Sequence, residues 1–420
     1  MIKKILKNED WLSFGIGLII VLLAVAGIHF GSPKYEWKSL SALLNNFSGG
    51  PNLLNIGLTF VVILILGLLT RILKPKGNLS VLAGTFFLFV IAVISQVVAG
   101  FGPIKYYGFE YVIFALLFGI LIRGVFGVPK WLEENLHTEF LIKTGLVILG
   151  AGIIFGDIIK AGSLGLIQAL VVVLAVWFFA WWISGKLKVD DELRIMISSA
   201  VSICGVSAAI ASAGAIKGDG KKLSYVVSLV LIIALPMLII LPLLAKWMEL
   251  NPAQAGAWLG GTIDTTGAVV ASGSLLGEEA LKYATIVKFS QNVLIGFAAV
   301  AISVFWAFRK RTSETTEKKT KVDFKLIWER FPKFVLGFII ASLLYSFVID
   351  AETVSLTKGY LKNIQTAVFA IAFVCIGLET DFKALLTTGN GRPAWAYVIA
   401  QVFNIIFTLL IAWLLFANSW

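Results

Sequence analysis

Long, continuous apolar runs set the strongest limit on what this chain can fold into. Stretches of about 20 apolar residues match the length that an α-helix needs to cross a bilayer. Membrane-spanning β-strands would instead alternate apolar and polar residues over about ten positions. Only 14% of the 420 residues are charged and 59% are hydrophobic, far from the balance of a soluble domain. The chain is therefore predicted to be an all-α, polytopic integral membrane protein.

Short loops separate thirteen of these apolar segments. The first follows the basic stretch Met1–Lys7, and we expect it to be a membrane span, with a cleaved signal peptide as the alternative. The other twelve are expected to be membrane segments as well. The thirteen segments lie near residues 11–30, 52–70, 80–101, 111–126, 141–157, 163–185, 192–216, 223–247, 253–274, 280–308, 331–349, 361–380 and 394–417.

The distribution of Lys and Arg predicts a cytoplasmic N-terminus, because basic residues gather in cytoplasmic loops. The densest group, residues 309–321, then lies inside, and the net charge of +11 is loop charge, too scattered to indicate nucleic-acid binding. Only the loop Lys217–Lys222 would lie outside against this rule. We expect 192–216 and 253–274 to be broken spanning helices. The alternative is that both are re-entrant, which would move Lys217–Lys222 inside and leave everything downstream unchanged.

The order of the segments fits two inverted repeats of five segments each. Residues 1–102 would be additional N-terminal helices, followed by a first repeat in 103–248 and a second in 249–420. The charged stretch 309–329 is predicted to be a cytoplasmic linker. This division pairs 192–216 with 361–380, since each contains a cysteine near a glycine. A likeness between residues 145–157 and 374–381 would pair different helices, so two alignments of the repeats stay open.

One apolar segment, 192–216, carries small polar residues that a lipid-facing helix would not need. Ser202, Cys204, Gly205 and Ser207 fall within six positions. A helix that breaks there would expose free N–H groups at the start of its second half, a favourable place for an anion. We predict that these residues bind substrate, with Cys204 as a small apolar filler. The alternative is a small-residue face for helix packing.

A second polar stretch lies in the segment 253–274, around Asp264. An ionisable residue at the centre of a membrane helix costs about 2.5–3.5 kcal/mol, so it is expected to face a cavity or a partner. Asp264 is the candidate for coupling to H+ or Na+. The hydroxyl groups beside it could coordinate Na+ or bind an oxyanion, and the predicted substrate-binding residues here are Thr262, Thr265, Thr266 and Gly267. Close packing of small residues is again the alternative.

Lys288 lies well inside the segment 280–308. We predict that it supplies a fixed positive charge, paired with Asp264 or facing an anionic solute. Gln291 and Asn292 follow at i+3 and i+4, on the same helix face. Asn292 is therefore a candidate for substrate binding and Gln291 for ion coupling. In the alternative, Lys288 extends its ammonium group toward the membrane surface.

Other catalytic signals are absent from the sequence. It holds no phosphate-binding loop, no His-Glu-x-x-His pair and no nucleophile with a nearby base, so we expect no enzyme and no cofactor. Cys204 and Cys375 are too few for a metal site or a disulfide framework. His29 and His137 are far apart and are assigned no role.

Three stretches carry a resemblance to a known family. Ser202-Ile-Cys-Gly-Val-Ser-Ala208, Gly261–Gly273 and Ala284–Lys288 are similar to the YeiH-like sulfate exporter family of bacterial inner-membrane proteins. The resemblance implies a secondary carrier related to cation–proton antiporters and bile-acid symporters. It also implies inverted repeats, discontinuous crossing helices, a core domain, a panel domain and a homodimer.

The second stretch departs from the family pattern, in which many members have Ile-His-Asp/Glu-x-Ala-Gln-Val. Here Asp264 takes the place of the histidine, Thr265 that of the acid, and Ala268 that of the glutamine. The coupling ion or the substrate is therefore expected to differ from those of other members.

Together these features predict a secondary-active transporter of small anions such as sulfate, sulfite or an organic sulfonate, and the family resemblance implies export. Its partners would be the anion, a coupling H+ or Na+, and membrane lipid. The alternative is a passive anion channel, or a membrane sensor that binds a partner and carries out no coupled transport.

Overall fold

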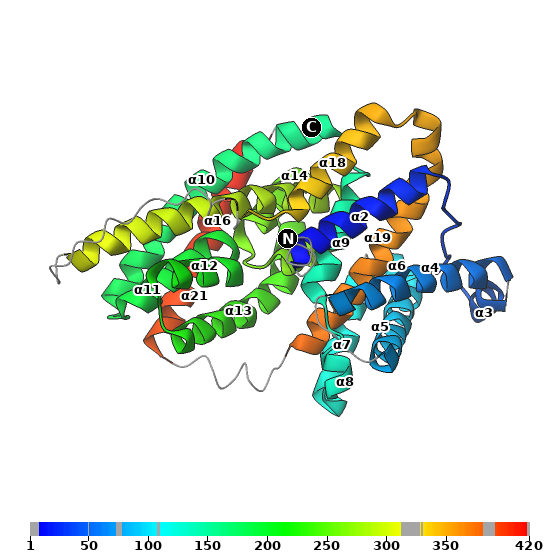
Figure 1. Cartoon of the computed structure of the whole chain (residues 1–420), viewed down its shortest axis with the longest axis horizontal. Helices are drawn as coiled ribbons and strands as arrows, with labels where there is room; N and C mark the ends of the chain where they lie inside the picture. The colour runs from blue at the N-terminus through cyan, green and yellow to red at the C-terminus, as the bar shows by residue number, and fades with distance from the viewer. Residues whose placement is uncertain are drawn as a thin grey trace. The chain divides into compact units, whose positions relative to one another are not determined.

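The computed structural model describes residues 8–48, 50–72, 78–106, 110–311, 328, 331–380 and 391–417. These residues form helices and loops, with an isolated β-bridge between Trp37 and Phe101. Figure 1 shows the helices. Their bounds are α2 (Glu9–Val25), α3 (Leu40–Ser48), α4 (Gly50–Leu69), η1 (Thr70–Ile72), α5 (Asn78–Ala99), α6 (Gly102–Tyr106), α7 (Tyr111–Phe126), α8 (Lys130–Glu133), α9 (Thr138–Gly150), α10 (Phe155–Lys186), α11 (Asp191–Ser199), η2 (Ala200–Cys204), α12 (Val206–Ile216), α13 (Gly220–Trp247), α14 (Pro252–Thr262), α15 (Thr266–Leu275), α16 (Glu278–Arg311), α18 (Phe334–Leu343), η3 (Leu344–Val348), α19 (Ala351–Glu379) and α21 (Arg392–Leu415).

Each of the thirteen predicted segments coincides with one to three of these helices. In the described part of the chain, seven helices are long and apolar enough to cross a membrane, and shorter apolar helices accompany them. The prediction of an all-helical membrane fold is confirmed at this level. The predicted linker 309–329 lies outside the described residues, apart from 309–311 and 328.

The chain divides into two compact units that cut across the predicted repeats. Unit 1 comprises Met1–Asp157 and Lys333–Phe382, and unit 2 comprises Ile158–Pro332 and Lys383–Trp420. The inverted repeats stay a prediction. The segment 192–216 is interrupted, whereas its proposed mate 361–380 lies within the continuous helix α19. A second interruption occurs in 252–275 instead, between α14 and α15.

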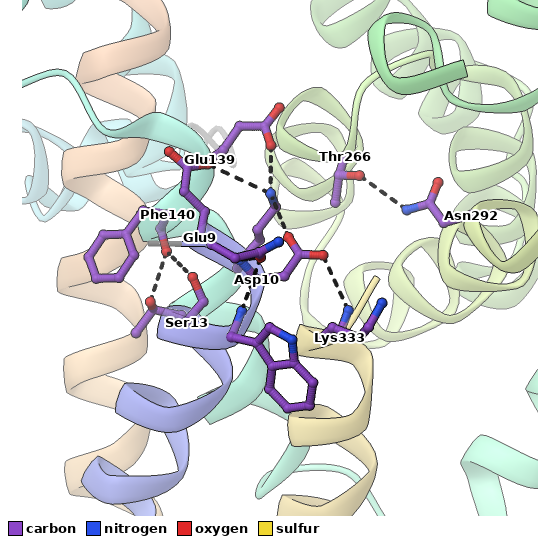
Figure 2. Close-up of polar contacts among 12 residues, drawn as sticks. Glu9, Asp10, Ser13, Glu139, Phe140, Thr266, Asn292 and Lys333 are labelled. Atoms are coloured by element: carbon purple, nitrogen blue, oxygen red, sulfur yellow. Dashed lines mark hydrogen bonds and ion pairs between the residues drawn. The ribbon is translucent and has the colours of Figure 1, made fainter. Parts of the chain in front are cut away.

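Unit 1 is held together by glycine contacts and by a group of charges at the start of α2 and α9. Gly119 of α7 and Gly377 of α19 lie backbone against backbone, so that a side chain at either would overlap the other helix. Figure 2 shows the carboxylates of Glu9, Asp10 and Glu139 around one ammonium group, that of Lys143. These charges join the first turns of two helices that pack together.

A Lys143→Met variant should lower the stability of unit 1. The Nζ atom of Lys143 lies 2.9 Å from Asp10 Oδ1 and 2.7 Å from Glu139 Oε2, and the lysine side chain is only 15% exposed. Its loss would leave the partly buried carboxylate of Asp10 beside the more exposed carboxylates of Glu9 and Glu139, at a cost of about 1–2 kcal/mol. Thermal unfolding of the purified protein measures the effect. Lys160→Met, at an exposed lysine of α10, is the control, and equal melting temperatures for both variants would contradict the prediction.

In unit 2 the segment 191–216 folds back on itself, and we call it the first hairpin. Its arms α11 and α12 lie side by side (Figure 1), joined by the π-helical turn η2. The two ends of the segment meet: Lys222 Nζ lies 2.7 Å from Asp190 Oδ1, and the Asp219 N–H donates to Glu192 at 3.3 Å. The expectation of a broken spanning helix is therefore wrong, and the re-entrant alternative fits.

The segment 252–275 also returns to the end where it began, and we call it the second hairpin. Its start is fixed by a capping box between Asn251 and Gln254 with proline at the first helical position. Gly256, near that start, lies against Ala280 and Tyr283 of α16. Gly273, near the end of α15, lies against Leu281 and Ala284 in the same part of α16. The spanning expectation is wrong for this segment too.

The two hairpins enter unit 2 from opposite ends and touch at their tips. Helix α13 connects them, and its 28 residues give a length of about 42 Å, enough to cross a bilayer. At the tips, a Cβ atom on Gly205 would lie 3.0 Å from the Cβ of Asp264. Gly205 has φ +59° and ψ −112°, a conformation that favours glycine. A residue without a side chain therefore ends the first arm and lets the second hairpin approach.

Helix α13 is fixed to the second hairpin by a hydrogen bond that a proline makes available. Pro242 has no N–H to donate to the carbonyl of Leu238, four residues before it. The hydroxyl of Ser272 in α15 donates to that carbonyl instead, at 3.0 Å.

Candidate functional site

Lys288 lies between the two hairpin tips and bonds to both. Its side chain is 1% exposed, and Nζ donates to the backbone carbonyls of Ile203 at 2.9 Å and Ile263 at 2.8 Å. Its third bond goes to Gln291 Oε1 at 3.0 Å. Both carbonyls lie at the C-terminal ends of half-helices, where the backbone carries partial negative charge. The ammonium group thus satisfies carbonyls freed by both breaks.

Asp264, at the tip of the second hairpin, is 2% exposed and accepts a hydrogen bond from Tyr397. The Tyr397 hydroxyl lies 2.7 Å from Asp264 Oδ2, and the tyrosine on α21 is itself fully buried. The acid predicted for ion coupling therefore sits at the junction of the hairpins, beside Gly205 and one residue after a carbonyl that Lys288 holds.

Helix α21 supplies further donors to the freed carbonyls. Gln401 Nε2 donates to the carbonyl of Thr262 at 3.0 Å. Asn404 Nδ2 donates to the carbonyls of Val201 at 3.0 Å and Thr262 at 3.3 Å, so this one amide contacts both hairpins. Thr408 Oγ1 donates to Asn404 Oδ1 at 2.8 Å and orients it.

Two amides from other helices also donate to carbonyls of α14. Gln168 of α10 donates to the carbonyl of Ala257, and Gln291 of α16 to that of Gly261, both at 2.8 Å. Gln168 and the four residues on α21 were not among the residues predicted from the sequence. A signal for the latter was present, because positions 397, 401, 404 and 408 are spaced to fall on one helix face.

The N-terminal ends of the second arms are more open than the C-terminal ends of the first arms. Gly205 precedes α12 and has no side chain to cap its first N–H groups, and Ser207 in that turn is exposed. At the start of α15, Thr265, Thr266 and Gly267 are half-buried. Asn292 Nδ2 lies 3.4 Å from Thr266 Oγ1, as Figure 2 shows.

The remaining predicted residues are buried within the first hairpin. The Ser202 hydroxyl donates to the carbonyl of Ser198 at 2.7 Å, one turn earlier in its own helix. Cys204 packs among Ile203, Ala208, Ile295 and Ala299, as an apolar filler would. Both cysteines are free and buried. Within the described ranges, no three His, Cys, Asp or Glu side chains gather as metal ligands would.

Comparison with known proteins places these helices in a family. The family model described as "Conserved hypothetical protein 698" matches residues 83–396, which include both hairpins, Lys288 and Asp264. The chain belongs to this family. A UPF0324 membrane protein of Rhodopirellula baltica is 36% identical over 91% of this chain and 70% of its own length. A UPF0324 membrane protein of Nitratidesulfovibrio vulgaris is 38% identical over 80% of this chain.

The chain spans 59% of the Nitratidesulfovibrio relative. Both relatives come from bacteria and are described as membrane proteins. The present chain is accordingly a multi-pass membrane protein, and both of its hairpins lie within the part that the family shares.

Proposed function

We propose that this protein is a secondary-active transporter of small anions in a bacterial cytoplasmic membrane. Sulfate, sulfite and organic sulfonates are the proposed solutes, in line with the resemblance to YeiH-like sulfate exporters, and H+ or Na+ is the coupling ion. The observation that carries the proposal is the contact between two re-entrant hairpins at Gly205 and Asp264. Interrupted helices of this kind offer backbone groups to a solute inside the bilayer.

The open side of the junction suits an anion. The start of α12 is uncapped, whereas at the start of α15 the Thr265 hydroxyl accepts a hydrogen bond from the Ala268 N–H. Both helix starts bring partial positive charge to this side, near Ser207 and Thr266. Hydroxyl groups and the Asn292 amide add neutral hydrogen-bonding partners there. No enzyme activity is proposed, because this set of groups contains donors for binding and no nucleophile beside a base.

In this proposal Lys288 positions the two hairpin tips and does not bind the anion directly. Its three N–H groups are all taken by protein oxygens, so it holds the tips together and contributes positive charge from behind them. Asp264 is the proposed coupling residue, since it is the buried carboxylate at the same junction.

The first hairpin is proposed to open from the cytoplasm. Its ends carry Lys186, Lys188, Lys217, Lys221 and Lys222, whereas α16 begins at the opposite end with Glu278 and Glu279. With this orientation Lys217–Lys222 would lie in the cytoplasm, where basic loop residues are expected.

Cysteine labelling tests the arrangement of the hairpins. In a Cys204→Ala, Cys375→Ala background, Lys217→Cys should be labelled only from the cytoplasmic side and Glu278→Cys only from the opposite side. Both residues are exposed. If 192–216 and 253–274 crossed the membrane, these two positions would lie on the same side. Labelling of both from one side would therefore contradict the hairpin arrangement.

Transport itself is tested in proteoliposomes. Sulfate, sulfite and a short alkyl sulfonate would be supplied with an imposed Na+ or H+ gradient. The transporter should accumulate its substrate above electrochemical equilibrium and lose that accumulation when the gradient collapses. Flux that always stops at equilibrium would show a passive channel, and no flux of any anion would reject the proposal.

A further inference from the structure

Three side-chain oxygens around the end of α14 have no hydrogen-bond partner. They are Gln168 Oε1, Thr262 Oγ1 and Gln401 Oε1. The three residues are 0%, 1% and 2% exposed. A buried polar atom without a partner is costly, and such atoms mark the place of a bound ion or water.

The two glutamine oxygens are acceptors whose orientation is fixed. The Gln168 amide nitrogen donates to the carbonyl of Ala257, and that of Gln401 donates to the carbonyl of Thr262. Turning either amide around would place its oxygen against a carbonyl oxygen. The unpaired atoms are therefore oxygens in both residues.

All three residues are in contact with the last two turns of α14. Gln168 lies against Ala257 and Gly261, Gln401 lies at the carbonyl of Thr262, and Thr262 ends the helix. The C-terminal end of a helix carries partial negative charge. Neighbouring donors are already engaged, because Asn404 and Lys288 bond to backbone carbonyls.

We propose that these three oxygens bind Na+ at the C-terminal end of α14. A cation is indicated because the two fixed amide oxygens can only accept, the Thr262 hydroxyl oxygen can also accept, and the helix end carries partial negative charge. Neutral oxygen atoms of this kind are suitable ligands for a hard monovalent cation. In secondary transporters, the C-terminal ends of half-helices contribute to the coordination of Na+. Asp264, two residues after Thr262, adds the negative charge. The role of this ion in coupling rests on the proposed transport function, whereas its binding does not.

The test compares two substitutions at Thr262 in the purified full-length protein. Thermal unfolding is followed as NaCl replaces choline chloride at constant ionic strength, with KCl as a second series. Wild type and Thr262→Ser, which keeps the oxygen, should show a saturable rise in melting temperature with NaCl. Thr262→Val, which removes only an unpaired hydroxyl, should need about tenfold more NaCl for the same rise, by mass action. Thr85→Val, at a buried threonine of α5, should behave as wild type.

Gln168→Met gives a second reading of the same site if Thr262→Val does not fold. An equal NaCl response in wild type, Thr262→Val and Gln168→Met would overturn the assignment of these ligands. A wild-type protein that NaCl does not stabilise, but that sulfate or sulfonate does, would mean that water fills the site. That result would reject the cation site and leave anion transport standing. Stabilisation by NaCl lost in Thr262→Val, without transport in proteoliposomes, would support the site and reject the transport function.

Discussion

A Lys288→Met variant is expected to lose anion uptake and to melt at a much lower temperature than the wild-type protein. Methionine keeps the length of the side chain but cannot donate a hydrogen bond. The carbonyls of Ile203 and Ile263 and the oxygen of Gln291 would then be buried without a donor. Each such group costs about 1–3 kcal/mol, so the summed loss is a large part of a typical folding free energy.

Thermal unfolding and uptake into proteoliposomes measure this effect together. Lys282→Met is the matched control on the same helix. Lys282 pairs at 2.8 Å with Glu279, whose side chain is half-exposed, so its loss should cost less than the loss of the three buried bonds of Lys288. A Lys288→Met protein with the melting temperature and uptake of the Lys282→Met protein would show that the ammonium group does not hold the tips.

An Asp264→Asn variant is expected to fold normally and to lose uptake driven by an ion gradient. The asparagine oxygen can still accept the hydrogen bond that Tyr397 donates at 2.7 Å, so the junction should keep its packing. The amide cannot carry the negative charge that a coupling H+ or Na+ would neutralise. Uptake should fall to the level of protein-free liposomes under every gradient.

The uptake of this variant is measured over a series of pH values and Na+ concentrations, with its melting temperature recorded alongside. Tyr397→Phe is the companion variant, because it removes the hydroxyl donor and leaves the carboxylate. It should retain uptake with a shifted dependence on pH or Na+. Normal uptake by Asp264→Asn across the whole series would exclude Asp264 as the coupling group.

The sequence predicts the helices well because bilayer length and apolar composition set their limits. All thirteen segments were located, and both breaks fall where small polar residues and Asp264 interrupt apolar runs. Hydrophobicity does not say whether a broken segment crosses the membrane or turns back, so the hairpins were expected only as the alternative to broken spanning helices. The basic loop Lys217–Lys222 was the one sign of them, since spanning segments would place it outside, against the rule that basic residues gather in cytoplasmic loops.

The candidate site was predicted in part. Gly205, Asp264 and Lys288 meet at the junction, and their residue types are unusual enough inside apolar segments to reveal them. Gln401 and Asn404 were missed, because their role depends on carbonyls that only the folded hairpins expose. Ser202 was predicted to face the solute, but its hydroxyl bonds within its own helix, which sequence spacing alone does not determine.

In the proposed transporter, the bonds between the two tips constrain how access to the substrate site can alternate between the two sides of the membrane. Lys288 and Asn404 each hold one carbonyl of the first hairpin and one of the second. Moving one hairpin without the other would separate buried carbonyls from their donors. Each carbonyl left without a hydrogen bond costs about 1–3 kcal/mol. For the proposed transport cycle we therefore expect a movement of lower free-energy cost, in which both hairpins move together as one rigid block that contains the proposed anion site.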